Sequence, residues 1–372
     1  MKQTERKVFL CGGLTGGPII PLLAVSKNIP YQPIIIGVNN SFEKKLSQKR
    51  GYKFLQLPMT KLSLLTFSQR NISNLVVGFF DGLINFFKLL WSLILSIIYV
   101  FLNKPSLVLS AGGFTSVPII LVANFLKIIG VINCKIVIHQ QDPKVGLSNR
   151  ITAKYADLLS CTFEYTKNNY SQFSDSLIIP NPLDISKFAN KKFENNNLEN
   201  FLKSSTKPVL FVFGGGSGAM KINSWVNKNL KQITKNFSVV HLTGVLQKKS
   251  DPINNLNDYF SLISLDEDMG IMMKKADIVL CRAGLGSISE LLYLNKKAFL
   301  VPINKSHQEQ NANQVKESFY ILDESEMSNW LSYILRQYNN GFHDKKFPSS
   351  ASIERDLQAY YKKVNELDKK KQ

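Results

Sequence analysis

The chain has 372 residues, of which 44% are hydrophobic and 20% are charged. This composition supplies enough apolar material for packed cores and excludes disordered and collagen-like proteins. The length favours two domains, at roughly 100–200 residues each. The four cysteines form no Cys-x-x-Cys pair, and the four histidines form no His-x-x-x-His pair. This spacing argues against a structural zinc site or a disulfide framework, and for a reducing compartment.

Basic residues outnumber acidic residues by 46 to 27, which gives a net charge of +19. The surplus is uneven along the chain. Residues 1–150 contain 17 Lys and Arg against 4 Asp and Glu, whereas the remaining 222 residues contain 29 against 23. The first part of the chain should therefore meet an anionic partner, such as phosphates, nucleic acid or an acidic lipid surface.

Short apolar, β-branched runs alternate with longer helical patterns along the chain. The predicted strands are residues 7–11, 33–37, 107–110, 135–139, 158–162, 208–213, 238–243, 261–264, 277–281 and 298–301. The first run is too short for the core of an export signal, so we read it as a strand. Continuous apolarity within the runs is typical of parallel strands covered by helices on both faces. The sequence predicts an α/β fold.

A second apolar segment, residues 75–102, is a candidate membrane contact. Asp81, Asn85 and Lys88 interrupt it, and the 14 residues from 89 to 102 that carry no charge fall short of the ~20 needed to cross a bilayer. Two interpretations remain open: a buried core helix, or a helix whose aromatic side chains partly enter one leaflet. Flanking basic residues favour the second interpretation.

The two halves of the chain begin alike, each with a strand that runs into glycines and then into a helix. This suggests two Rossmann-like domains whose parallel sheets face an interdomain cleft, with a break near Ile179-Pro180-Asn181-Pro182. We expect residues 1–180 to form the first domain and residues 181–348 the second. The C-terminal helix, residues 349–372, is a candidate to pack back on the first domain.

Glycine clusters follow two predicted strands of the first domain. Gly12-Gly13-Leu14-Thr15-Gly16-Gly17 follows one strand, and Ala111-Gly112-Gly113-Phe114-Thr115-Ser116 follows the other. Glycines let the backbone approach an anion, and the helix that follows directs its free N–H groups at the same place. The spacing matches neither Gly-x-Gly-x-x-Gly nor a P-loop. The loops are thus predicted to grip one diphosphate, although glycine in such turns also serves tight packing.

The second domain repeats the pattern in Gly214-Gly215-Gly216-Ser217-Gly218-Ala219 and in Cys281-Arg282-Ala283-Gly284-Leu285-Gly286-Ser287-Ile288-Ser289-Glu290. Ser217 could bind a phosphate oxygen or cap a helix. Glu290 could accept hydrogen bonds from two vicinal ribose hydroxyls. Alternatively, its negative charge could simply interact favourably with the positive end of the helix dipole. His307-Gln308-Glu309-Gln310-Asn311 offers amide and imidazole groups for sugar hydroxyls, although such runs are often exposed helix.

These segments and their order along the chain resemble the MurG family. The resemblance also includes Pro21, His139-Gln140-Gln141-Asp142, Gly146-Leu147-Ser148-Asn149, Asn181-Pro182 and Asp268-Met269. Members of the MurG family are family 28 glycosyltransferases that add N-acetylglucosamine to the undecaprenyl-pyrophosphoryl-muramoyl-peptide precursor of peptidoglycan. The likeness covers roughly residues 7–315. It implies a GT-B fold, with UDP-N-acetylglucosamine held mainly by the second domain and the lipid-linked acceptor by the first.

The resemblance also implies site residues. The donor-binding positions are Thr15, Gly16, Gly17, Asp142, Asp184, Gly216, Ser217, Asp266, Leu285, Gly286, Ser287, Ile288, Ser289, Glu290 and Gln308. The acceptor-binding positions are Gly13, Thr15, Gly112, Gly113, Phe114, Thr115 and Ser116. At Asp266 the family uses main-chain contacts to the uracil. No metal ion and no cofactor is implied.

The sequence departs from the family pattern at chemically important positions. Pro18 replaces the histidine that is usually proposed as the general base of the family. Asp142 replaces an asparagine, and Asp184 replaces an arginine. Gly216 replaces a serine, and a serine, Ser217, follows one place later. Asp142 becomes the first candidate for the base, although it could equally cap the helix beginning near Gly146. His139 is the second candidate for the base. The alternative is a structural role for His139 at a strand end, with its hydrogen bonds made within the protein.

The implied partners are UDP-N-acetylglucosamine, a lipid-linked pyrophosphate acceptor and an anionic membrane surface, which places the protein peripherally on the cytoplasmic face of the cell membrane. Nucleic acid is not expected, because the basic residues form no recognised binding motif. Two alternatives remain open. One is a GT-B glycosyltransferase that acts on another lipid acceptor, and the other is a catalytically impaired membrane scaffold that binds UDP-sugar.

Overall fold

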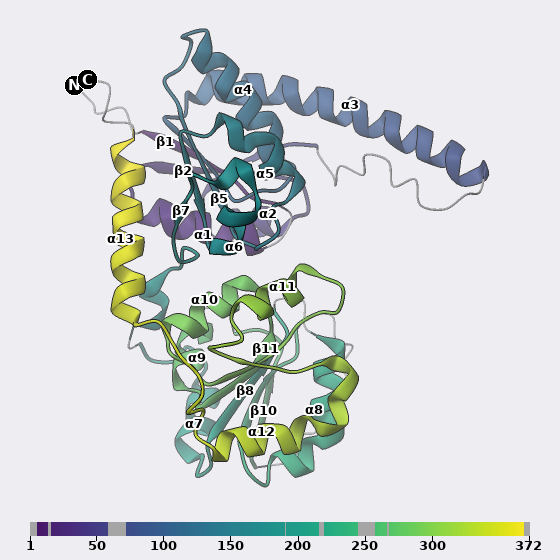
Figure 1. The fold of residues 1–372 in the computed structure, drawn as a ribbon, viewed down its shortest axis with the longest axis vertical. Helices are drawn as coiled ribbons and strands as arrows, with labels where there is room; N and C mark the ends of the chain where they lie inside the picture. The colour runs from purple at the N-terminus through teal and green to yellow at the C-terminus, as the bar shows by residue number, and fades with distance from the viewer. Residues whose placement is uncertain are drawn as a thin grey trace. The chain divides into compact units, whose positions relative to one another are not determined.

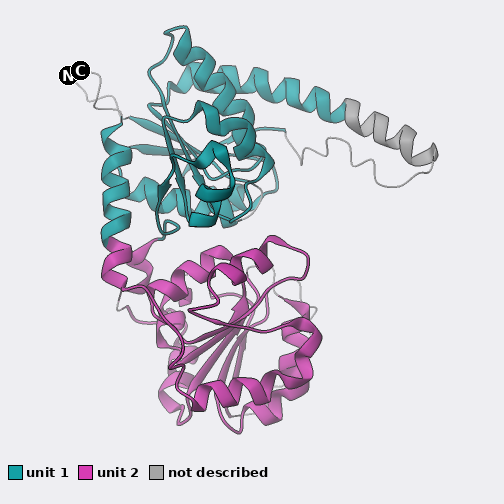
Figure 2. Cartoon of the chain, in the orientation of Figure 1, with its two compact units in different colours: residues 1–183, 355–372 teal, residues 184–354 magenta. Residues whose placement is uncertain are grey.

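The computed structural model describes residues 6–13, 16–58, 72–189, 191–215, 219–244, 257–265 and 268–367, with the backbone alone for residues 72–83. The chain divides into two compact units (Figure 2). Unit 1 comprises Met1–Leu183 and Arg355–Gln372, and unit 2 comprises Asp184–Glu354. Each unit has its own parallel sheet and its own hydrophobic core.

Among the described residues, unit 1 contains a seven-stranded parallel sheet in the order β3-β2-β1-β4-β5-β6-β7. Strands β1, β2, β5 and β7 of this sheet are labelled in Figure 1. Its strands are β1 (Lys7–Cys11), β2 (Gln32–Gly37), β3 (Lys53–Gln56), β4 (Leu107–Ser110), β5 (Lys135–Gln140), β6 (Leu158–Cys161) and β7 (Leu177–Ile178). Phe9, Ile34, Val108 and Ile136 point from adjacent strands into one core, together with Ile120 of a covering helix. Burial on the sheet faces explains the continuous apolarity of these strands.

The helices of unit 1 connect successive strands. They are α1 (Gly16–Lys27), α2 (Phe42–Arg50), α3 (Ile72–Asn103), α4 (Ser116–Ile128), α5 (Leu147–Thr152) and α6 (Glu164–Asn169), with short 3-10 helices η1 (Ala153–Tyr155) and η2 (Ser171–Phe173). The C-terminal helix α13 (Ser350–Glu366) ends in unit 1 (Figure 2). There the Ser160 hydroxyl of β6 donates to the Tyr360 hydroxyl at 3.2 Å.

Unit 2 contains, in its described residues, a six-stranded parallel sheet in the order β10-β9-β8-β11-β12-β13. Its strands are β8 (Val209–Phe213), β9 (Ser238–Leu242), β10 (Tyr259–Leu262), β11 (Ile278–Arg282), β12 (Ala298–Val301) and β13 (Tyr320–Ile321). Its helices are η3 (Ile185–Phe188), α7 (Asn196–Ser204), α8 (Met220–Ile233), α9 (Met269–Lys275), α10 (Leu285–Tyr293), α11 (His307–Gln314), η5 (Glu324–Asn329) and α12 (Trp330–Asn339). Trp225 of α8 and Trp330 of α12 pack against each other in the core.

The predicted fold class is confirmed, because both units are parallel α/β sheets with covering helices. Each of the ten predicted strands is present with ends within two residues of the prediction. Strands β3, β7 and β13 were not predicted. All four cysteines, Cys11, Cys134, Cys161 and Cys281, are free and buried.

Helix α3 differs from both the expected length and the buried-helix interpretation. Its Ile84–Asn103 part has a mean hydropathy of 1.9 and is long and apolar enough to cross a membrane, yet only 17% of it is buried. The prediction that this stretch is too short to cross a bilayer is wrong, because Lys88 alone does not interrupt its apolar character. The buried-core interpretation is wrong for these residues as well.

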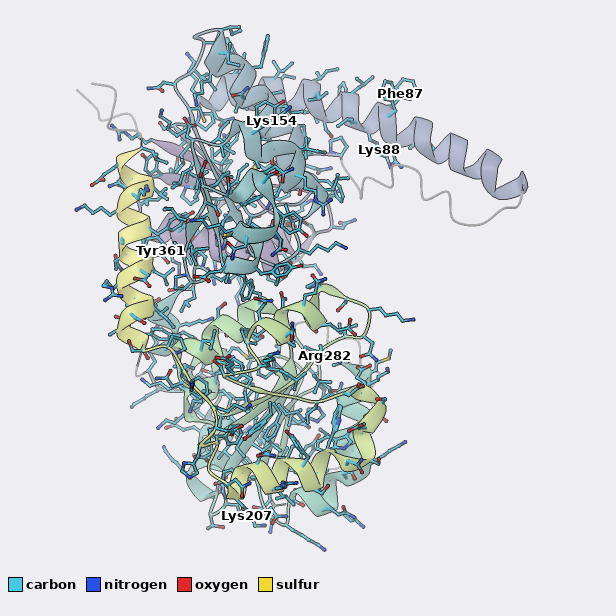
Figure 3. All side chains as sticks on the ribbon, in the orientation of Figure 1. Phe87, Lys88, Lys154, Lys207, Arg282 and Tyr361 are labelled. Atoms are coloured by element: carbon cyan, nitrogen blue, oxygen red, sulfur yellow. The ribbon has the colours of Figure 1, made fainter. Side chains whose placement is uncertain are left out.

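Exposed apolar side chains lie on α3, on α4, which packs beside it, and on the turn that follows α4. We call them the α3–α4 apolar surface: Ile84, Phe86, Phe87, Leu90, Trp91, Ile94, Ile97, Ile98, Phe101, Leu102, Phe125, Ile128, Ile129 and Val131. Phe87 and Lys88 extend from α3 at the surface of the unit (Figure 3). The end of the helix is fixed to unit 1, because Val100 is fully buried and the Tyr99 hydroxyl donates to the Gln56 carbonyl at 2.9 Å.

Candidate active site

In unit 1 the strand order reverses beside β1, which has β2 on one side and β4 on the other. Ligands of open α/β sheets bind outside the carboxyl ends of the strands at such a switch point. The loops that leave β1 and β4 contain Gly12-Gly13 and Gly112-Gly113. A Cβ at Gly113 would lie 2.4 Å from the Gly12 carbonyl oxygen and 2.6 Å from the Gly13 Cα. The structure therefore brings the two predicted loops into backbone contact.

Side chains of the second loop lock this contact. Thr115 Oγ1 donates to the Gly12 carbonyl at 2.7 Å, and Ser116 Oγ donates to the Gly113 carbonyl at 2.6 Å. Both side chains are buried, whereas Phe114 is half-buried. The hydroxyls of Thr115 and Ser116 thus hold the shape of this loop. That the two residues bind the acceptor stays a prediction.

The start of α1 holds the next predicted site residues. Gly16 and Gly17 begin this helix, and Thr15 lies outside the described residues. Gln141, for which no role was predicted, donates from Nε2 to the Gly17 carbonyl at 3.2 Å. A second unassigned residue is the fully buried Glu43 of α2: a Cβ at Gly12 would lie 3.4 Å from its Oε1. Neither has a local sequence signal, because both reach the loop from distant elements.

Unit 2 repeats the switch point, because β8 lies between β9 and β11. The loop from β11 leads through Gly284, the N-cap residue of α10. Because glycine has no side chain, the first N–H groups of this helix have no side-chain cap. Such groups, with the helix dipole, favour an anion. The loop from β8 contains Gly216 and Ser217, which lie outside the described residues, as does Asp266.

The predicted donor-binding residues of α10 differ in what they can offer. Ile288 is fully buried, Leu285 is buried, and the buried Ser289 hydroxyl donates to the Leu285 carbonyl at 2.7 Å. Gly286 is exposed and Ser287 is half-buried in the first turn. A ligand at this helix would therefore meet main-chain N–H groups, with Ser287 as the accessible hydroxyl of this turn.

Glu290 forms an ion pair that was not predicted from the sequence. The Lys187 Nζ of η3 donates to its Oε1, and the two side chains are 27% and 15% exposed. Asp184 lies at the N-cap of η3, where its Oδ1 accepts from the Ser186 N–H at 3.2 Å and from the Ser186 hydroxyl at 2.6 Å. Asp184 therefore caps the short helix that carries Lys187. Its binding to the donor stays a prediction.

Helix α11 brings the predicted amide cluster to the β11–α10 loop. The fully buried Asn311 donates from Nδ2 to the Ala283 carbonyl at 3.5 Å. Gln308 lies in the first turn, where its Oε1 accepts from the Ile303 N–H at 3.2 Å. Asn311 thus supports the loop, and Gln308 holds the segment before the helix through Ile303. Contact of Gln308 with the donor sugar stays a prediction. Within the described part of the chain, no three His, Cys, Asp or Glu residues form a metal-binding group.

Comparison with known protein families agrees with this arrangement. Residues 8–159 match the N-terminal domain of glycosyltransferase family 28, and residues 209–358 match the C-terminal domain of the same family. The chain belongs to glycosyltransferase family 28. The two matched domains contain the two switch points described above.

Several family 28 relatives resemble the chain over most of its length. A UDP-N-acetylglucosamine–N-acetylmuramyl-(pentapeptide) pyrophosphoryl-undecaprenol N-acetylglucosamine transferase from Lachnospira eligens is 31% identical, over 87% of this chain and 88% of the relative. The enzyme of the same name from Clostridium perfringens is 30% identical, over 87% of both chains. The crystal structure of Acinetobacter baumannii MurG has a TM-score of 0.64 at 19% identity, over 98% of this chain and 99% of that chain, a likeness that supports the GT-B fold.

In this family 28 chain, the two candidates for the general base differ in their surroundings. His139 is 2% exposed, and its ring nitrogens are hydrogen-bonded to the Ser160 hydroxyl at 3.0 Å and the Thr162 hydroxyl at 3.3 Å. Burial lowers the pKa of His139 to about 4. This geometry favours the structural role of His139, because both ring nitrogens already have hydrogen-bond partners within the protein. Asp142 is half-buried in the loop after β5, and Gly146 rather than Asp142 is the N-cap residue of α5.

Proposed function

We propose that the chain is an inverting glycosyltransferase that moves N-acetylglucosamine from UDP-N-acetylglucosamine to undecaprenyl-pyrophosphoryl-N-acetylmuramoyl-peptide in peptidoglycan synthesis. The observation that carries the proposal is the 31% identity, over 87% of the chain, to an enzyme named for this reaction. The glycine-rich loops at the two switch points support it, because both substrates carry a diphosphate.

In the proposed mechanism, an acceptor hydroxyl attacks the anomeric carbon of the donor sugar from the side opposite UDP. Negative charge develops on the departing diphosphate. Main-chain N–H groups of Leu285, Gly286 and Ser287 at the start of α10 would stabilise it, and loss of one such donor typically costs ~10²–10³ in rate. Glu290 would hold the ribose hydroxyls, and Gln308 would contact the donor sugar. Gly13, Gly112 and Gly113 would approach the acceptor diphosphate.

Asp142 is the proposed base that removes the proton of the acceptor hydroxyl. Its carboxylate lies in the loop after β5, beside Gln141, which contacts Gly17 in α1. The Asp142→Asn change should abolish transfer while UDP affinity persists, because it removes the proton acceptor and nearly preserves the shape. Transfer rates and UDP titration would check this. Full turnover in the variant would eliminate Asp142 as the base.

We also propose that unit 1 docks on the cytoplasmic face of the cell membrane through the α3–α4 apolar surface. Its exposed aromatic and aliphatic side chains can enter the acyl boundary of one leaflet, while basic residues such as Lys88 and Lys104 meet anionic headgroups. This docking would bring the enzyme to a lipid-linked acceptor.

The decisive experiment is transfer of labelled N-acetylglucosamine from UDP to a short-chain lipid I analogue, with Glu290→Ala as the control. Formation of the disaccharide by the unchanged protein, and loss of activity in the control, is the expected result. Transfer to diacylglycerol in place of the lipid I analogue would support the alternative that the protein is a GT-B glycosyltransferase acting on another lipid acceptor. Binding of UDP-sugar without transfer to either acceptor would support a catalytically impaired membrane scaffold. Pro18, which stands where the family has a histidine, is the observation that favours this alternative.

A further inference from the structure

The ion pair between Lys187 and Glu290 joins two segments that are 103 residues apart in the chain. Glu290 lies in the second turn of α10, behind the N–H groups at the start of that helix. Lys187 comes from η3, and its ammonium group also lies 5.0 Å from the centre of the Phe188 ring. Both charged groups are largely shielded from water, so their contact is screened less than a surface pair would be.

The backbone around Lys187 is held on two sides within unit 2. A Cβ at Gly270 of α9 would lie 2.4 Å from the Lys187 carbonyl oxygen, which shows that α9 packs directly on η3. Lys274 of the same helix donates from Nζ to the Phe188 carbonyl at 3.1 Å. The buried Phe188 ring stacks on Tyr293 of α10, with centroids 5.3 Å apart. Lys187 therefore leaves a fixed backbone and reaches a fixed helix.

We propose that Lys187 is a positioning residue for nucleotide binding, which holds the Glu290 carboxylate in the orientation that accepts the vicinal ribose hydroxyls of the donor. The inference rests on the proposed function of Glu290. A carboxylate has two oxygens and about four acceptor positions. The Lys187 ammonium occupies one position on Oε1, which leaves room for two hydroxyls. The ion pair already restricts the rotation of the Glu290 side chain in the free protein. Nucleotide binding therefore costs less conformational entropy of that side chain.

The test is calorimetric titration of the full chain with UDP and with 2′-deoxy-UDP. Lys187→Met keeps the length of the side chain and removes the ammonium. It should weaken UDP binding roughly tenfold, the size expected when a ribose hydroxyl loses its hydrogen bond to a charged carboxylate. It should change 2′-deoxy-UDP binding less than twofold. Lys187→Arg should restore most of the preference for UDP. In the Glu290→Gln background, Lys187→Met should have little further effect.

Lys203→Met is the matched control, because Lys203 pairs with Glu199 on α7 at the surface of the same unit, with 69% of its side chain exposed. It should bind both nucleotides as the unchanged protein does. Equal weakening of UDP and 2′-deoxy-UDP by Lys187→Met would overturn the proposal, since it would indicate a phosphate contact or a damaged fold. Unchanged UDP binding would overturn it too. Failure of the unchanged protein to bind UDP would instead refute the proposed function.

Discussion

Gly113 is the most constrained of the described glycines in unit 1, because its φ is +86° and a Cβ would lie 2.4 Å from the Gly12 carbonyl oxygen. Gly113→Ala must therefore strain the backbone and separate the two loops. We expect it to lower the free energy of unfolding by at least about 2 kcal/mol and to reduce transfer. Chemical denaturation of both proteins would measure the change.

Gly286→Ala provides the contrast. A Cβ at this first-turn position of α10 would meet no other atom within 4 Å. Alanine is the better helix former by roughly 0.5–1 kcal/mol. The variant should therefore be as stable as the unchanged protein or slightly more stable. A Gly113→Ala protein as stable as Gly286→Ala would show that the loops are not in backbone contact.

His139 and His241 make stability depend on pH, because both are buried and burial lowers the pKa of each from 6.5 to about 4. The unfolded chain binds these protons at a higher pH than the folded chain does. Their contribution is therefore fully present above pH 6.5 and is lost as the pH falls towards 4. At pH 5 the loss should be about 2 kcal/mol for each histidine.

Unfolding measured at pH 7.5 and pH 5.0 would check this. The control is the double variant His139→Gln and His241→Gln, whose stability should change less between the two pH values. Acid destabilisation of the same size in both proteins would assign the effect to other groups, such as the carboxylates.

Some site residues could be predicted from local sequence and others could not. The glycine clusters stand out because each follows an apolar strand, and their placement at the switch points follows from parallel topology. The capping of η3 by the Asp184 carboxylate could not be predicted, because it depends on a four-residue 3-10 helix without a strong sequence signal. The Lys187–Glu290 pair is a contact between distant segments, which no local pattern reports.

Among the secondary-structure elements, the missed strands share one property. Strands β3, β7 and β13 are edge strands with four, two and two residues. In β3, Lys53 and Gln56 flank only two apolar residues, so the run is too short and too polar to indicate a strand. The central strands were predictable because both of their faces are buried.

Helix α3 is the element on which membrane binding should depend. Replacing the exposed Phe87, Trp91 and Leu102 by serine removes apolar area that does not support the core, so the fold should be retained. Each side chain contributes up to about 1.5–3 kcal/mol on burial in an apolar phase. The triple variant should bind vesicles at least about tenfold more weakly, which a flotation assay would detect.

Tyr165→Ser is the control for that assay, because Tyr165 is an exposed aromatic residue of α6 in the same unit and outside the α3–α4 apolar surface. It should float as the unchanged protein does. If the triple variant retains full vesicle binding, another surface is responsible for docking.

For the whole molecule, the uneven charge predicts how docking responds to salt. The surplus of 13 basic residues within residues 1–150 should attract anionic vesicles, with ~1 kcal/mol for each Lys or Arg near the surface. Binding should weaken as ionic strength rises, because the Debye length shortens. Co-sedimentation at increasing NaCl would test this; equal recovery with neutral and anionic vesicles at low salt would contradict it.

The burial of every cysteine gives the molecule a useful chemical property. Burial raises the pKa of the Cys11 and Cys281 thiols, and thiols in such surroundings react slowly, because the thiolate is the nucleophile. A cysteine introduced at an exposed position, such as Ile128 on α4, would therefore be the fastest group to couple to a maleimide dye. A polarity-sensitive fluorophore there could follow arrival at a bilayer in real time, with all native cysteines left in place.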